Sequence, residues 1–212
     1  MGAKTWMLVY ANAKVAEALK GYPQLDRVAT LRLATRLFPK DNLEVIGDGN
    51  LSYTCPPDDE LHICCFPGVA ILAAKEFGID CPSKLPERFI SEGANGATYL
   101  HAMHSVVDWL AFAQWVNGEL VRSLSLCPDR GILEDKGDRF SFEEPFWSGQ
   151  HPATEDEGSS YPFPFHPLEL GEVALKEFFG YQLEGFGDTS TPLRPESIPL
   201  IKYKRRSRWK FW

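Results

Sequence analysis

Two histidines and an aspartate lie close together in residues 99–109, and side chains of these types bind metal ions. The segment reads YLHAMHSVVDW, which places His101, His104 and Asp108 at positions i, i+3 and i+7. On an α-helix the three side chains would share one stripe, within about 60° of each other. Imidazole and carboxylate ligands at that spacing would suit zinc or iron. On a β-strand, His101 and His104 would point to opposite faces and no such site would form.

The residues that follow favour the strand for residues 98–116. Asn117-Gly118 lies between two runs of apolar residues. This dipeptide is a strong signal for a two-residue hairpin turn, because both positions must adopt a positive φ. We therefore expect two paired strands here and histidines that bond to their neighbours within a sheet. A metal-dependent enzyme centred on His101, His104 and Asp108, with a divalent ion as its cofactor, is the alternative.

The turn also predicts a register for the two strands. The expected cross-strand pairs are Val116–Glu119, Trp115–Leu120, Ala113–Arg122 and Ala111–Leu124. In this register four large apolar side chains are expected to be buried together on one face: Trp109, Trp115, Leu120 and Leu124. The other face also carries apolar residues such as Phe112, so both sides of the sheet should be at least partly covered.

No complete catalytic motif is present, so we expect no catalytic residue and no bound cofactor apart from the metal alternative. The sequence lacks a G-x-S-x-G elbow, a P-loop and a G-x-G-x-x-G loop. One pair of basic residues has an alternative interpretation. Arg32 and Arg36 share one side of a helix expected to begin at Asp26 and to end before Pro39. A solvated face is the simpler interpretation, and an anion site is the alternative.

The arrangement of elements predicts an α+β fold in a single domain, with a mostly antiparallel sheet and helices on one face. Helices are expected early, where Asn12 and Asp26 suit N-caps, and late, between Pro167 and Gly180. Hairpins are expected in the middle, one of them around residues 47–50. The expected organisation is an α+β core over 1–147, an acidic Pro-, Gly- and Ser-rich loop over 148–166, a helix packing on the core over 167–186, and an extension over 187–212.

Composition favours a cytoplasmic protein in which the cysteines are reduced. The chain has 212 residues, a formal net charge of −7 and five cysteines. The negative charge argues against a general nucleic-acid binder. The odd number of cysteines, without metal-ligand spacing, is typical of a reducing compartment. No signal peptide and no run of 18 apolar residues is found, so no transmembrane insertion is expected.

The end of the chain differs from the rest because it is basic and aromatic. Residues 202–212, KYKRRSRWKFW, contain six Lys or Arg and no acid. We expect this segment to dock on the acidic body of another protein or of a second copy of the chain. Nucleic acid ranks second as the partner, and an anionic membrane surface ranks third. The residues expected to bind are Lys202, Tyr203, Lys204, Arg205, Arg206, Arg208, Trp209, Lys210, Phe211 and Trp212.

Three long segments together resemble a known family. They begin with MGAKTW at the start, contain LHAMHSVVDW in the middle and include HPLELGE near the end. They are similar to a group of bacterial proteins, common in actinobacteria, that is described as a domain of unknown function. The resemblance spans roughly residues 1–186 and implies one intact domain, but it implies no activity and no site. A non-enzymatic binding or interaction module, or a component of an assembly, is the function we expect.

Overall fold

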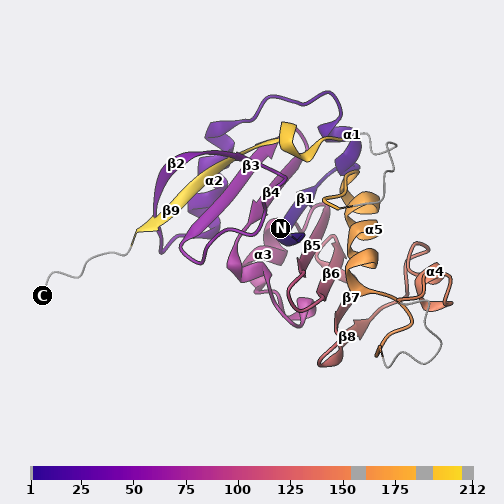
Figure 1. Cartoon of the computed structure of the whole chain (residues 1–212). Helices are drawn as coiled ribbons and strands as arrows, with labels where there is room; N and C mark the ends of the chain where they lie inside the picture. The colour runs from indigo at the N-terminus through magenta and orange to yellow at the C-terminus, as the bar shows by residue number, and fades with distance from the viewer. Residues whose placement is uncertain (1, 154–160, 185–192, 207–212) are drawn as a thin grey trace, which may run out of the picture.

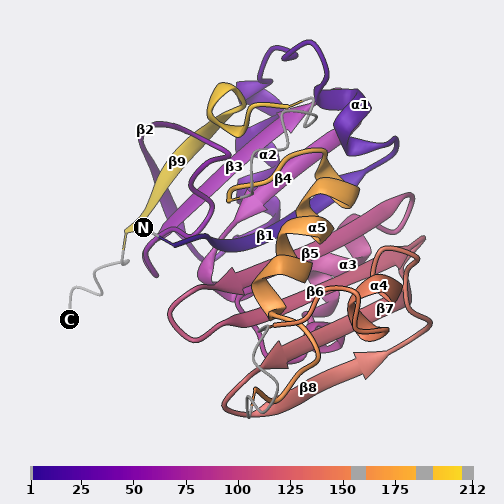
Figure 2. The same ribbon diagram turned by 45° about the vertical axis from the view of Figure 1, so that its right-hand side comes forward.

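One nine-stranded antiparallel sheet forms the centre of the protein. The computed structural model describes residues 2–153, 161–184 and 193–206. The strand order is β2-β9-β3-β4-β1-β5-β6-β7-β8, and every neighbouring pair is antiparallel (Figure 2). The strands are β1 (Lys4–Ala11), β2 (Asn42–Asn50), β3 (Glu60–Phe66), β4 (Val69–Ala73), β5 (Ala97–His104), β6 (Trp109–Val116), β7 (Glu119–Cys127), β8 (Gly131–Lys136) and β9 (Pro199–Arg206).

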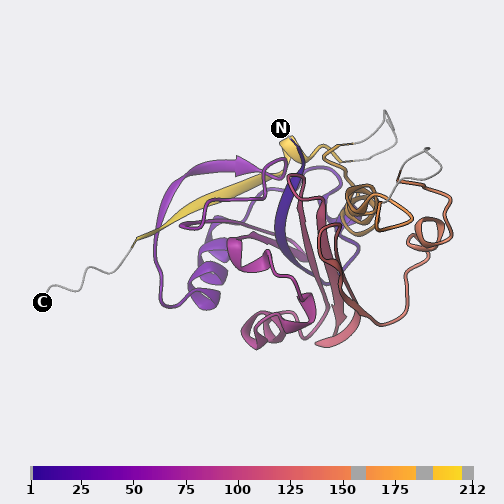
Figure 3. The same ribbon diagram turned by 60° about the horizontal axis from the view of Figure 1, so that its bottom comes forward.

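Helices cover both faces of this sheet (Figure 3). They are α1 (Val15–Leu19), α2 (Arg27–Leu37), α3 (Glu87–Glu92), α4 (Glu144–Trp147) and α5 (Pro167–Phe179), with short 3-10 turns at Lys75–Phe77, Pro82–Lys84 and Pro195–Ser197. The apolar residues of α2 and α3 join one core cluster, and those of α1 and α5 join the other. In the described part of the chain no helix is long and apolar enough to cross a membrane.

The antiparallel α+β class is confirmed, but the expectation that the helices lie on one face is wrong. The reason lies in the central strands, which are apolar on both sides. Along β1, Met7 and Val9 belong to the cluster beneath α5, while Leu8 and Tyr10 belong to the cluster beneath α2. A strand that is apolar on both faces needs cover on both faces.

The ends of the two longer helices follow local rules. The Asp26 side chain accepts a hydrogen bond from the backbone N–H of Ala29 at 2.8 Å, as an N-cap should. Pro167 occupies the first turn of α5, and Gly180 ends that helix with a φ of 82°. Asn12 caps no helix, because α1 begins three residues later with Lys14 as its N-cap residue.

The hairpin at Asn117-Gly118 is confirmed, with φ values of 52° and 82°. Its first two pairs, Val116–Glu119 and Trp115–Leu120, are the expected ones. The register then shifts by one residue, so that Gln114 faces Arg122. The pairs expected beyond this point are wrong, because an extra residue at Val121 forms a bulge and turns every later side chain to the opposite face.

The bulge also changes the expected core. Trp109 and Trp115 are buried on the α2 side, but Leu124 is buried on the α5 side and Leu120 is 38% exposed. The four residues are therefore not buried together. The same shift turns the Arg122 side chain inward, where none of it is exposed. Its guanidinium donates to both carboxylate oxygens of Glu143, at 2.9 and 2.7 Å, and also to Asp135.

The last described strand, β9, lies inside the sheet between β2 and β3 (Figure 1). Tyr203 pairs with Val45 of β2 on one side and with Leu61 of β3 on the other, and only 1% of its surface is exposed. Part of the segment expected as an extension over 187–212 therefore completes the sheet. Residues 154–160, within the expected loop, lie outside the described residues.

Candidate functional site

The three candidate metal ligands do not come together. Residues 98–116 form β5 and β6 with a turn at 105–108, so the strand interpretation is confirmed. His101 faces α5, whereas His104 stacks on Trp6 on the opposite side of the sheet. Asp108 lies in the turn, 3.5 Å from the ring of His166. Within the described ranges there is no group of three His, Cys, Asp or Glu side chains suited to one metal ion.

His101 instead joins three elements of the core. Its Nε2–H donates to the carbonyl of Gly171 in α5 at 3.0 Å, and its Nδ1 accepts from the Thr5 hydroxyl at 2.8 Å. The carbonyl can only accept, which assigns the proton to Nε2. Burial lowers the pKa of His101 to about 4, so the ring is neutral. Both nitrogens are used in holding α5 on β5 and β1, and neither is left for a ligand.

The residues expected to bind a partner divide at the end of β9. Residues 202–206 are part of that strand, and several of their charges are paired within the chain. Lys204 lies 2.7 Å from a carboxylate oxygen of Asp59, and Arg205 donates to Glu76 at 2.6 Å. Arg208, Trp209, Lys210, Phe211 and Trp212 lie outside the described residues.

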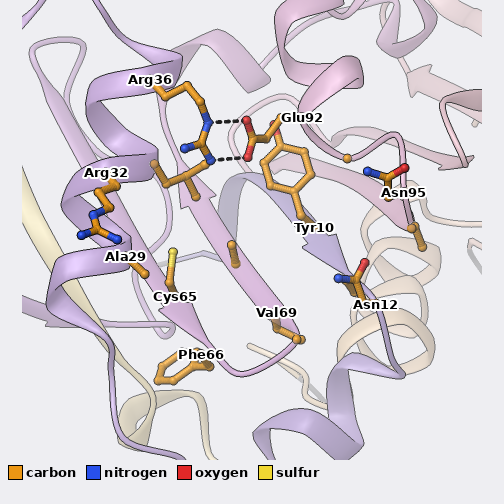
Figure 4. Close-up of a pocket in the computed structure, with 17 residues that line it drawn as sticks. Tyr10, Asn12, Ala29, Arg32, Arg36, Cys65, Phe66, Val69, Glu92 and Asn95 are labelled. Carbon is orange, nitrogen blue, oxygen red and sulfur yellow. Dashed lines mark hydrogen bonds and ion pairs between the residues drawn. The ribbon is translucent and has the colours of Figure 1, made fainter.

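A cleft of about 440 Å³ lies between α2 and the segment that joins α3 to β5 (Figure 4). Its floor is the β3–β4 hairpin, including Cys65, Phe66 and Val69. Thr30 fixes this floor to α2, because its hydroxyl accepts a hydrogen bond from the backbone N–H of Cys65 at 3.0 Å. A cavity of this size accommodates a small organic molecule.

The walls of the cleft carry polar groups of two kinds. Arg32 projects from α2 on one side, and Asn12 and Asn95 lie on the other (Figure 4). The Arg36–Glu92 ion pair closes one end: the guanidinium donates to both carboxylate oxygens, with a Nε–Oε2 distance of 2.7 Å. Arg32, by contrast, has no carboxylate partner among the residues that the structure describes.

The other titratable groups of the cleft are held neutral. Tyr10 is 8% exposed and donates its hydroxyl to the carbonyl of Phe89 at 2.9 Å, and burial raises its pKa. Burial also raises the pKa of the Cys65 thiol, so the reactive thiolate is disfavoured at neutral pH. Among the described residues that line it, the cleft therefore holds one unpaired cation, Arg32, together with one internal ion pair and neutral donors. This arrangement suits binding of an anion better than nucleophilic catalysis.

A loop of small residues makes the amide wall possible. A Cβ atom at Gly96 would lie 2.3 Å from the Asn12 side-chain oxygen, and one at Gly93 would lie 2.8 Å from the Tyr10 ring. Glycine is therefore required for the loop to approach β1 so closely. The spacing of Arg32 and Arg36 indicates an anion site as one alternative, whereas no pattern in the sequence brings Asn12 and Asn95 to the same cleft.

The sequence and the fold can be compared with those of known proteins. A family model described as "Family of unknown function (DUF6928)" matches residues 5–203, and the chain belongs to this family. The match continues beyond residue 186 and includes most of β9, in keeping with the place of that strand inside the sheet. Neither the search of curated proteins nor the search of solved structures found a match.

Proposed function

We propose that this protein is a non-enzymatic binding module whose α2 cleft takes a small organic anion. One observation carries the proposal: Arg32 faces the cleft without a carboxylate partner in the described part of the chain, opposite the amides of Asn12 and Asn95. A guanidinium binds carboxylate or phosphate oxygens through two parallel N–H donors. The side-chain amides supply further donors and acceptors for the body of the ligand.

The Arg36–Glu92 pair supports an anion of limited charge. Because Glu92 neutralises Arg36, Arg32 alone sets the formal charge among the described residues that line the cleft. The pair is bidentate and connects α2 to α3, so it also keeps the two walls at a fixed separation. A monoanion or a phosphate monoester with a flat apolar body suits this combination of charge and volume.

Replacing Arg32 with glutamine is expected to weaken the binding of phenyl phosphate at least about tenfold, since one charge-assisted hydrogen bond contributes roughly 1.5–3 kcal/mol. Isothermal titration calorimetry of the full chain at pH 7.5 measures the change. Arg139→Gln is the matched control, because this substitution removes the same charge from an exposed arginine. Arg139 lies outside the cleft, where it stacks on Trp147. Equal binding by the wild type and Arg32→Gln would reject the cleft as the anion site.

Replacing Glu92 with glutamine is expected to raise the affinity for phenyl phosphate. The substitution leaves Arg36 in place but removes the carboxylate that neutralises it. A second positive charge near the ligand adds about 1 kcal/mol in water, or roughly fivefold in affinity. The gain should disappear in 1 M NaCl, because salt screens exposed charges. A loss of affinity would instead mean that the pair positions the ligand, or that the ligand is not an anion.

Docking of a protein partner or of a second copy is a further part of this proposal. The charged and aromatic residues that β9 does not use are Arg208, Trp209, Lys210, Phe211 and Trp212. Docking should therefore be tested by deleting residues 207–212, which leaves β9 intact. Loss of an oligomer on sizing would support docking, and loss of salt-sensitive nucleic-acid binding would support the nucleic-acid alternative.

A reducing, cytoplasmic setting fits the five cysteines, all of which are free.

A further inference from the structure

A second cavity, of about 740 Å³, lies on the other side of the sheet beside α5. One wall is the outer side of α5, which contributes Leu168, Glu169 and Glu172. Another wall is aromatic: the rings of Phe146 and His151 stack with their centroids 4.4 Å apart. The α2 cleft and this cavity share no lining residue.

The charge of this cavity is opposite to that of the cleft. Three carboxylates line it, those of Glu169, Glu172 and Glu184, and no lysine or arginine is among the described residues that do so. His166 also lines the cavity, but both of its nitrogens are in use. Its Nδ1 accepts from the backbone N–H of Leu168 at 3.3 Å, and its Nε2 lies 3.5 Å from a carboxylate oxygen of Asp108. The lining therefore favours a positively charged ligand.

Glu172 is the buried carboxylate of this cavity, and one of its two oxygens has no hydrogen-bond partner among the described residues. It is 8% exposed, and its Oε2 accepts the backbone N–H of Leu183 at 2.8 Å, which holds the chain after α5 against the helix. Its Oε1 is covered and has no hydrogen-bond partner in the described part of the chain. A buried oxygen without a partner is costly in either protonation state, since as carboxylate it lacks a donor and as carboxylic acid it lacks an acceptor.

The environment of Glu172 holds it between its two protonation states near neutral pH. Burial and, to a smaller extent, the nearby charge of Glu184 raise its pKa to about 7, against hydrogen bonds from the backbone of residues 183 and 184. The other ionisable groups on the surrounding elements are Glu169, Lys176 and Glu177 on α5, His166 at its start, His151 after α4 and Tyr181 after α5. Lys176 does not line the cavity, and none of the described residues that line it is a lysine or an arginine.

We propose that the α5 cavity binds a protonated organic amine with a flat apolar body. The ammonium group pairs with the carboxyl group of Glu172, and the apolar body lies against Phe146 and Leu168. On binding, a protonated Glu172 releases its proton to solvent and pairs with the ammonium as a carboxylate. The inference concerns a site on the opposite face of the sheet and does not depend on the anion cleft.

The test uses two probes of almost the same shape that differ in charge. Tryptamine carries an ammonium group at pH 7.5, and tryptophol carries a neutral hydroxyl in its place. Calorimetry of the full chain is expected to give a dissociation constant below about 1 mM for tryptamine. Tryptophol should bind at least about tenfold more weakly, because its hydroxyl carries no positive charge to pair with the Glu172 carboxylate.

Two variants place the binding at Glu172. Glu172→Gln is expected to weaken tryptamine binding at least about tenfold and to leave tryptophol binding unchanged. Glu177→Gln is the matched control, because Glu177 is an exposed residue of α5 that does not line the cavity. Circular dichroism and thermal melting check that both variants are folded.

Proton release on tryptamine binding can be measured on the wild type. It would not occur if Glu172 had only a structural role. With a pKa of about 7, Glu172 is about half protonated at pH 7, so the wild type should release about half a proton for each tryptamine bound. Titrations in two buffers of different ionisation enthalpy measure this number. Three results would each overturn the proposal. They are equal affinity for the two probes, no saturable binding of tryptamine up to about 5 mM, and tryptamine binding without proton release.

Discussion

Replacing Arg122 with methionine is expected to lower the free energy of unfolding by about 3–5 kcal/mol, because it leaves a buried carboxylate without its partner. Neither Arg122 nor Glu143 has any exposed side-chain surface. Burial opposes the charge of Arg122, but hydrogen bonds to Glu143 and Asp135 outweigh it and raise the pKa of the guanidinium. Methionine has a similar volume, so the loss would reflect the unpaired charge rather than a large cavity.

The expected melting temperature of Arg122→Met is roughly 6–20 °C lower, at about 2–4 °C for each kcal/mol in a chain of this size. Urea denaturation followed by tryptophan fluorescence gives the free energy directly.

Two further variants separate the buried charge from arginine in general. Arg130 forms an equally close ion pair with Asp80, at 2.6 Å, but about half of each side chain is exposed. Arg130→Met should therefore cost less than about 1 kcal/mol. The double variant Arg122→Met, Glu143→Leu should recover much of the lost stability, because it removes both charges. If Arg122→Met costs no more than Arg130→Met, the buried network does not stabilise the fold as described.

Ending the chain at residue 201 is expected to abolish the native sheet. The deletion removes Lys202–Arg206, which pair with residues 42–47 of β2 and with residues 60–62 of β3. It also removes Tyr203, which is fully buried. Loss of a buried aromatic side chain typically lowers the free energy of unfolding by about 3–5 kcal/mol. The total loss should exceed about 5 kcal/mol, a large share of the stability of an ordinary domain. Near-ultraviolet circular dichroism and solubility after expression report the outcome.

Ending the chain at residue 206 is the matched control for this truncation. It keeps the whole of β9, including the ion pair of Arg206 with Glu44. We expect this shorter deletion to melt within about 3 °C of the full chain, in line with the small effects of most changes outside the core. A folded protein that ends at residue 201 would mean that β2 does not need β9 as its neighbour.

Local patterns predicted those parts of the fold that local chemistry determines. Asn117-Gly118 predicted a hairpin because only a few residue pairs adopt two positive φ angles, and Pro167 with Gly180 bounded α5 for similar reasons. The prediction failed where the deciding partner is distant. Gly47 suggested a turn, but with a φ of 147° it lies where the register of β2 shifts against β9, whose strand is more than a hundred residues away.

The candidate sites show the same division. Arg32 and Arg36 could be placed on one side of a helix from their spacing alone. The sequence did not indicate that Glu92 forms an ion pair with Arg36 and not with Arg32. Glu172 could be placed on α5, yet its missing partner depends on how the chain returns along the helix after Gly180. The alternative of a histidine stripe failed because it required a helix, whereas the expected turn at Asn117 required strands on both sides.

The position of β9 has a consequence for how the protein is made. β2 ends at Asn50, but its only neighbour in the described sheet ends at Arg206. At a synthesis rate of about 5–20 residues per second, the nascent chain exposes an unpaired β2 and an open edge of β3 for roughly 8–30 s. Open strand edges pair readily with other chains. Translation speed and chaperone supply should therefore affect the yield of this protein more than its final stability would suggest.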